Sequence, residues 1–248
     1  GTKEITLLGQ TVNSYGKNLA EGRVPFSQLL EILSGIPGLE RIRYTSPYPR
    51  DFKSDLISTI RNNPCVMEHC HMPLQAGNND LLKRMKRLYT VESFREIVSE
   101  LRAAVPDVGL TTDIIVGFPG ETEEEFEGTL ACMREFRFDG AYMFRYSPRP
   151  GTPAAEMEQV DRQVGADRLQ KLIDLQRQIT EEINASLVGK EFEVLVESQS
   201  PKNPSMLQGY SRCFRMMHFE GDIKKLKGEL VTVRAEKSHM WGLSGEIV

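Results

Sequence analysis

The chain has 248 residues, a formal net charge of −4 and 40% hydrophobic residues. This composition supports a folded core and two domains, and it excludes a disordered or strongly basic chain. No apolar run reaches the length of a membrane-spanning helix and no secretory signal is visible, which predicts a cytoplasmic protein with no membrane partner. Residues 186–248 hold nine basic and eight acidic residues, so charge alone does not indicate nucleic-acid binding.

Strand and helix patterns alternate through the first 150 residues. Strands are predicted at 4–9, 41–46, 69–75, 110–117 and 141–147, with helices between them at 25–36, 52–63, 80–105 and 122–136. This alternation predicts a parallel sheet with right-handed crossovers. The strands end in polar residues and lack a GxGxxG motif, which favours a partial (βα) barrel over an open doubly wound sheet.

The segment 110–126, LTTDIIVGFPGETEEEF, is the most informative in the chain. A β-branched strand runs into a Gly-Phe-Pro-Gly turn, and a helix follows with a predicted capping box between Thr122 and Glu125. Such a unit places free backbone amides and a positive helix end at the carboxyl edge of the sheet. This edge is where α/β proteins bind small molecules.

The pattern changes after residue 160. Residues 164–187 have the spacing of one amphipathic helix. Short strands follow at 191–198, 205–212, 214–221, 229–236 and 241–248, which predicts a small closed barrel of the oligonucleotide-binding (OB) kind. We therefore expect domains at 1–185 and 186–248, the first being α/β and the second all-β.

The four cysteines do not form a metal-binding pattern. In the segment CVMEHCH, His69 and His71 share one face of a strand and Cys70 takes the other, so these side chains do not converge on a metal. Cys132 and Cys213 are expected to be buried apolar residues, and no disulfide is expected.

Five motifs in one order resemble a known family. They are GTKEITLLGQTVNSYG, SPYPRDF, MPLQAGNNDLLKRMKRLYT, TTDIIVGFPGETEEEFEGT and FRYSPRPGTPAAEM. Together they resemble the methylthiotransferases, a radical S-adenosylmethionine family, and the terminal barrel resembles their RNA-binding TRAM domain. LLGQTVNSYG is most similar to the branch that makes 2-methylthio-N6-isopentenyladenosine in tRNA. The resemblance implies a radical-SAM barrel, here without its first strand.

Alternatives remain at this point. They are the branches acting on threonylcarbamoyladenosine tRNA or on ribosomal protein S12, a non-catalytic RNA-binding protein, and an unrelated βα-barrel lyase or aldolase. The last of these requires a lysine or metal-binding carboxylates at strand ends, where this chain has mostly Gln, Ser, Thr and Gly.

The iron–sulfur ligands implied by the resemblance are not in this sequence. The family uses a CxxxCxxC loop for one 4Fe–4S cluster and three further cysteines for a second, and no cysteine here has that spacing. We therefore expect the chain to be part of a longer enzyme that also needs an electron donor. No catalytic residue and no metal ligand is predicted within the chain, which is expected to be inactive alone.

The resemblance also implies residues for S-adenosylmethionine. The guanidinium of Arg87 suits the methionine carboxylate of the cofactor, because it can form forked, charge-assisted hydrogen bonds. Gln10 suits the methionine amino group, and the backbone at 115–117 suits the adenine. The alternative for Arg87 is that the basic run KRMKR is an ordinary solvated face of a helix. The alternative for residues 115–117 is that they belong only to the core of a strand. The predicted cofactor residues are Gln10, Ser46, Gln75, Arg87, Ile115, Val116, Gly117, Phe144 and Tyr146.

A second set of residues is predicted to contact the tRNA anticodon stem-loop. Aromatic and basic side chains on short strands hold RNA by stacking and phosphate contact. The alternative is that Tyr210 fills the small barrel and that the lysines form an ordinary polar turn. The predicted substrate or RNA residues are Asn13, Arg149, Tyr210, Arg212, Arg215, Lys224 and Lys225.

Overall fold

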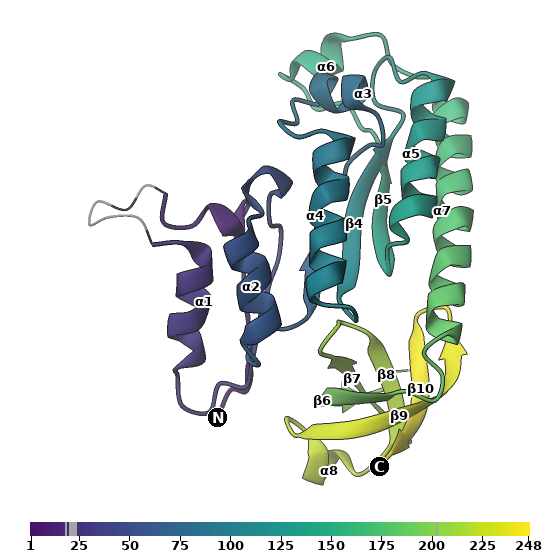
Figure 1. Ribbon diagram of the computed structural model, residues 1–248. Helices are drawn as coiled ribbons and strands as arrows, with labels where there is room; N and C mark the ends of the chain where they lie inside the picture. The colour runs from purple at the N-terminus through teal and green to yellow at the C-terminus, as the bar shows by residue number, and fades with distance from the viewer. Residues whose placement is uncertain (18, 20–23, 202) are drawn as a thin grey trace.

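A computed structural model describes residues 1–17, 19, 24–201 and 203–248. It contains an α/β part and a small β-barrel joined by one long helix (Figure 1). No helix in the described part of the chain is long and apolar enough to cross a membrane.

The α/β part repeats the predicted strand–helix unit. Its strands are β1 (Glu4–Leu7), β2 (Arg41–Tyr44), β3 (His69–His71), β4 (Gly109–Val116) and β5 (Gly140–Arg145). They are all parallel, in the sheets β1-β2 and β3-β4-β5, and a bridge between Ile42 and Val66 joins the two sheets. The strands therefore follow one another in chain order, which confirms the partial (βα) barrel.

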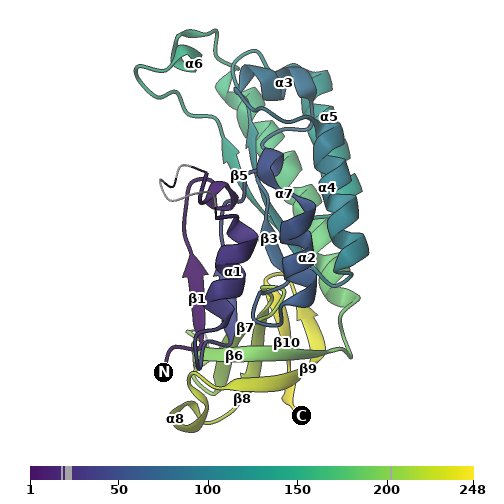
Figure 2. The same ribbon diagram turned by 60° about the vertical axis from the view of Figure 1, so that its left-hand side comes forward.

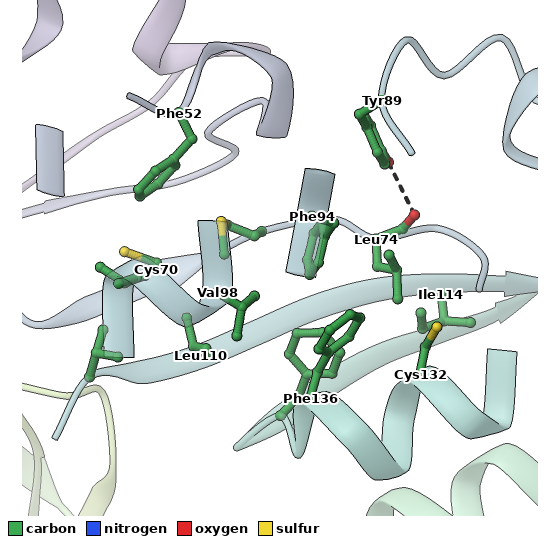
Figure 3. Close-up of a cluster of buried hydrophobic side chains, with 14 of the residues drawn as sticks. Phe52, Cys70, Leu74, Tyr89, Phe94, Val98, Leu110, Ile114, Cys132 and Phe136 are labelled. Carbon is green, nitrogen blue, oxygen red and sulfur yellow. Dashed lines mark hydrogen bonds between the residues drawn. The ribbon is translucent and has the colours of Figure 1, made fainter. Parts of the chain in front are cut away.

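Helices cover one face of this sheet (Figures 1 and 2). They are α1 (Phe26–Ser34), α2 (Ser54–Asn62), α3 (Asn79–Arg84), α4 (Val91–Ala104) and α5 (Glu123–Phe136), with the short 3-10 helices η1 (Val12–Ser14) and η2 (Pro49–Asp51). The core lies between helices and sheet. Phe94 of α4 packs against Phe136 of α5 with ring centroids 5.3 Å apart, in the cluster that also contains Leu110 and Ile114 of β4 (Figure 3).

The prediction of one helix over 80–105 was wrong, because the chain breaks into α3 and α4. Lys86 has a left-handed backbone with φ of 58°, which ends the first helix. Thr90 then starts the second with a capping box to Ser93. Between them, the Tyr89 hydroxyl donates to the backbone oxygen of Leu74 at 3.1 Å and ties this connection to the sheet edge (Figure 3).

The C-terminal strands form the predicted closed barrel. Its strands are β6 (Glu191–Gln199), β7 (Met206–Ser211), β8 (Met216–Glu220), β9 (Leu230–His239) and β10 (Gly242–Ile247), in the order β10-β8-β7-β6-β9, with a short α8 (Ile223–Leu226). Alternate side chains such as Val194, Val196 and Phe219 fill it.

The connecting helix α7 (Arg162–Ala185) fixes the distance between the two functional regions. Its 24 residues correspond to about 36 Å. It begins beside the carboxyl end of β4, since a Cβ on Gly117 would lie 3.5 Å from the Cα of Gly165. It ends at the small barrel, which covers the amino end of the sheet (Figures 1 and 2). The short α6 (Pro153–Glu156) lies near the opposite, carboxyl end.

Candidate functional site

Three strands end in the same unusual backbone conformation. Ser46, Gln75 and Gly117 follow β2, β3 and β4, and their φ values are 57°, 70° and 69°. Positive φ is uncommon for residues other than glycine, and such positions gather at ligand sites. The structure therefore brings three predicted cofactor residues to one sharply turned edge.

A buried ion pair holds the Gly-Phe-Pro-Gly turn at this edge. The Gly117 amide donates to Glu121 Oε2 at 2.6 Å, and Arg168 of α7 donates to the same oxygen at 2.9 Å. Burial raises the pKa of the Glu121 carboxyl, against the opposing effect of these two donors. The Gly117 amide thus already has a partner, and the turn owes its shape to Glu121 and Arg168, which the sequence patterns did not single out.

Arg87 and Arg84 lie near this edge, and the Nε of each is buried without a hydrogen-bond partner in the described part of the chain. The terminal nitrogens of Arg84 pair with Glu125 at 2.5 Å. The half-buried Arg87 forms no such ion pair with the described residues. A buried unpaired guanidinium nitrogen is costly, so this position suits a carboxylate ligand.

The sheet face away from the helices carries a row of polar side chains. Strand alternation puts His69, His71, Thr111 and Asp113 on this face, which we call the inner face. Thr111 Oγ1 lies 3.0 Å from His69 Nε2 and 2.9 Å from His71 Nδ1. His71 Nε2 lies 3.3 Å from Asp113 Oδ1. The four side chains therefore form one hydrogen-bonded row that leads toward the carboxyl edge.

The direction of donation along this row follows from the Asp113 carboxylate, which can only accept. His71 donates to it from Nε2–H, which leaves His71 Nδ1 to accept from the Thr111 hydroxyl, and Thr111 Oγ1 then accepts from His69 Nε2–H. Burial is the main cause that lowers the pKa of His69 to about 3, so its ring is neutral. This arrangement fixes the Asp113 carboxylate on the inner face, where its side chain keeps 29% exposure.

The other predicted cofactor residues divide between the two faces. Phe144, at 53% exposure, and Ile115 lie side by side on the inner face, and Tyr142 is exposed next to His71. The Val116 side chain is fully buried on the helix side, so only its backbone faces the edge. Tyr146 packs edge-on against Phe118, with centroids 5.1 Å apart.

Three residues predicted for RNA lie instead at the junction of the two domains. Arg212 pairs with Glu68 at 2.7 Å, and Arg215 pairs with Asp139. The Tyr210 ring stacks on Phe214, with centroids 4.4 Å apart. These three side chains have partners within the chain because they lie on the side of the small barrel that packs against the sheet. All three side chains also remain partly exposed, so their contact with RNA stays a prediction.

The same junction buries two arginines that the sequence analysis missed. Arg41 donates to Glu193 and to the backbone oxygen of Tyr210, and Arg43 donates to the backbone oxygens of Ser211 and Arg212. Arg41 is fully buried. The only signal in the sequence is RIRY, in which charged residues alternate within a strand.

The remaining predicted residues are spread over both ends of the molecule. Gln10 is exposed just after β1, and Arg149 is exposed in the loop before α6, so both lie toward the carboxyl edge. Asn13 is buried and both its amide atoms bond the backbone of Tyr48. Lys224 and Lys225 are exposed on α8, at the far end of the small barrel.

The cysteines do not suit a cluster. Among the described residues, no group of three or more His, Cys, Asp or Glu is placed to hold a metal ion. Burial raises the pKa of Cys70 to about 12 and that of Cys132 to about 11, so both remain thiols, whereas clusters need thiolates. Cys70 lies 3.2 Å from the Tyr44 hydroxyl, on the helix side of the sheet.

Comparison with known proteins agrees with this geometry. Residues 1–133 match the sequence family described as the Radical SAM superfamily, and residues 185–248 match the TRAM domain. The whole chain is 50% identical to a tRNA-2-methylthio-N(6)-dimethylallyladenosine synthase from Natranaerobius thermophilus and 48% identical to one from Acetivibrio thermocellus. The chain spans about half of these relatives, 54% and 52% of their lengths.

A solved structure shares the fold. Coproporphyrinogen III oxidase from Escherichia coli, described as a radical SAM enzyme, superposes with a TM-score of 0.50 at 21% identity, over 62% of this chain and 36% of that one. At this identity the likeness concerns the fold alone.

Proposed function

Because the chain belongs to the Radical SAM superfamily, we propose that it forms the cofactor and substrate face of a tRNA methylthiotransferase. The observation that carries this proposal is the pairing of a sharply turned carboxyl edge with an inner face of exposed aromatic rings and an oriented carboxylate. The names of the similar relatives support dimethylallyladenosine as the substrate base. A tRNA substrate supports a cytoplasmic location for the enzyme.

S-adenosylmethionine fits the carboxyl edge. The unpaired Arg87 Nε suits its carboxylate, Gln10 and Gln75 suit its amino group, and the backbone at Ile115 suits its adenine. When bound, S-adenosylmethionine would supply the radical chemistry at carbon 2 of the substrate adenine. The residues of this chain bind and orient the reactants.

The iron–sulfur clusters do not fit the cysteines of this chain, and no step is assigned to them here. For the full-length enzyme we propose two 4Fe–4S clusters with ligands from residues outside this chain, and an external electron donor. The cysteines of this chain support this division, because Cys70, Cys132 and Cys213 are buried and Cys65 is partly buried, each in a different part of the fold.

The inner face suits an unstacked adenine. Tyr142 and Phe144 on β5 are 57% and 53% exposed and offer rings for stacking. Beside them, Asp113 presents a carboxylate that accepts the N–H of an N6-substituted adenine, and His71 holds this carboxylate in place. A base must leave its stack to reach such a face.

The test uses the full-length enzyme with S-adenosylmethionine, a reductant and an anticodon stem-loop that carries dimethylallyladenosine. Mass spectrometry of the nucleosides is expected to show the 2-methylthio product. Asp113→Asn is expected to raise KM for the stem-loop about tenfold, from the loss of one charge-assisted hydrogen bond, while cofactor binding stays unchanged. Absence of the product with active cofactor cleavage would refute the proposed function.

A further inference from the structure

A cavity of about 240 Å³ lies where the edge strand β5, the helix α7 and the small barrel meet. Met143 of β5, Ile173 of α7 and Met216 of β8 form apolar parts of its wall. Trp241, in the turn between β9 and β10, also lines it and is 80% exposed. The activity proposed above does not yet use this cavity.

Much of the polar wall is already engaged within the chain. Gln176 donates to the backbone oxygen of Phe138 at 2.8 Å, and Asn184 donates to that of His239 at 2.9 Å. Arg215 pairs with Asp139. Two polar atoms of the wall, Gln176 Oε1 and Arg215 Nε, are buried without a hydrogen-bond partner in the described part of the chain. The apolar part of the wall, formed by Met143, Ile173 and Met216, suits the hydrocarbon part of a ligand.

The cavity meets the inner face between Thr111 and Gly140. These two residues are partners across β4 and β5, and both line the cavity. The Thr111 methyl carbon lies 3.6 Å from where a Cβ would stand on Gly140, while the Thr111 hydroxyl holds the histidines. Because Gly140 has no side chain, the inner face is open here. Asp113 lies two residues further along β4, at about 7 Å.

We propose that this cavity binds the N6-dimethylallyl group of the substrate adenosine while Asp113 accepts the N6–H of the same base. The inference rests on the proposed function and adds the site that recognises the substituent. A branched five-carbon group is fully apolar and is long enough to reach from a base held at Asp113 to the opening at Gly140. Burial of each of its carbons strengthens binding roughly fourfold.

The threonylcarbamoyl group is the competing occupant. It carries a carboxylate, and Arg177 and Arg215 line the cavity together with Met143, Ile173 and Met216. Comparing the binding of the two modified stem-loops therefore decides which group the cavity takes.

The test measures binding without turnover. The full-length enzyme, loaded with S-adenosylmethionine and without reductant, is titrated by fluorescence anisotropy with three stem-loops that carry unmodified, dimethylallyl or threonylcarbamoyl adenosine. We expect the dimethylallyl stem-loop to bind about 10- to 100-fold more tightly than the unmodified one. Gly140→Val fills the opening, and Ile173→Phe fills the cavity from the opposite wall. Each is expected to lower that ratio about tenfold by weakening only the dimethylallyl complex.

The control is Ile36→Phe, a similar enlargement at a residue that is 48% exposed and outside the cavity. It is expected to leave the ratio unchanged. Thermal melting shows which variants are folded. If Gly140→Val does not fold, the test uses Ile173→Phe, which changes a residue on the surface of α7. An unchanged ratio in a folded filling variant would overturn the cavity assignment, as would equal binding of the threonylcarbamoyl stem-loop. If methylthio product still forms, only the cavity assignment fails, whereas its absence refutes the proposed function itself.

Discussion

The ring of Phe214, in the turn between β7 and β8, stacks on the ring of His69 in β3 with centroids 4.6 Å apart. This contact joins the small barrel to the hydrogen-bonded row that ends at Asp113. The small barrel therefore closes the amino end of the inner face, besides any contact that it makes with RNA.

Phe214→Ala is expected to lower the free energy of unfolding by about 2 kcal/mol, because both ring stacks are lost. Denaturant unfolding measures this change. Phe214 has a left-handed φ of 64°, so Phe214→Gly should be no less stable than Phe214→Ala, although glycine is usually the worse choice. Equal stability of Phe214→Ala and the unaltered protein would show that the stack contributes nothing.

Arg41→Met is expected to cost about 2 kcal/mol, because the backbone oxygens of Tyr210 and Glu193 lose their buried donor. The matched control is Arg234→Met, since Arg234 forms an exposed pair with Glu191. No measurable change is expected there. Thermal melting of both variants measures this difference in stability. Similar melting temperatures for the two variants would contradict a structural role for Arg41 at the domain junction.

Gly117→Ala is expected to weaken S-adenosylmethionine binding to the full-length enzyme about tenfold. A Cβ at Gly117 has room, with 3.5 Å to Gly165, so the cost of about 1–2 kcal/mol comes from the left-handed backbone and shifts the turn. Gly38→Ala carries the same conformational cost at φ 81° with open space around it. It should lower stability without changing cofactor affinity, as measured by calorimetry. An equal loss of cofactor affinity in both variants would show that the turn after β4 only connects this strand to α5.

His69 should make the protein sensitive to acid. Its pKa in the folded chain is lowered to about 3 from an ordinary value of 6.5, so the unfolded state binds the proton more readily. The stabilisation from the neutral ring is complete above pH 6.5 and is lost as the pH falls toward 3. The loss reaches about 2 kcal/mol at pH 5. His69→Gln keeps a donor for Thr111 and should show a shallower decline of stability between pH 6.5 and 5. Parallel pH profiles would refute this assignment.

The 248-residue chain alone is expected not to cleave S-adenosylmethionine, since its four cysteines are not spaced for a cluster. The assay follows 5′-deoxyadenosine after treatment with iron, sulfide and dithionite. Turnover by the chain alone would show that its cysteines do hold a cluster.

Local patterns in the sequence were enough to predict much of this protein. The alternation of strands and helices, the turn after Val116, the capping box at Thr122 and the five-stranded barrel each depend on neighbours a few residues apart, and the structure contains all of them. The family resemblance rested on motifs of the same short range. A break such as that at Lys86 escaped prediction because no glycine or proline marks it.

Only the tertiary structure decided which side chains meet. Arg41 and Tyr210 are 169 residues apart, and Thr111 is 40 residues from His71. Periodicity in the sequence gives the face on which a side chain lies, but not the element that will cover that face. Packing of the small barrel against the amino end of the sheet paired Arg212 with Glu68 and Arg215 with Asp139 at the junction, and it stacked Phe214 on His69. Registry between β3 and β4 then placed His71 beside Asp113, which gave the inner face its oriented carboxylate.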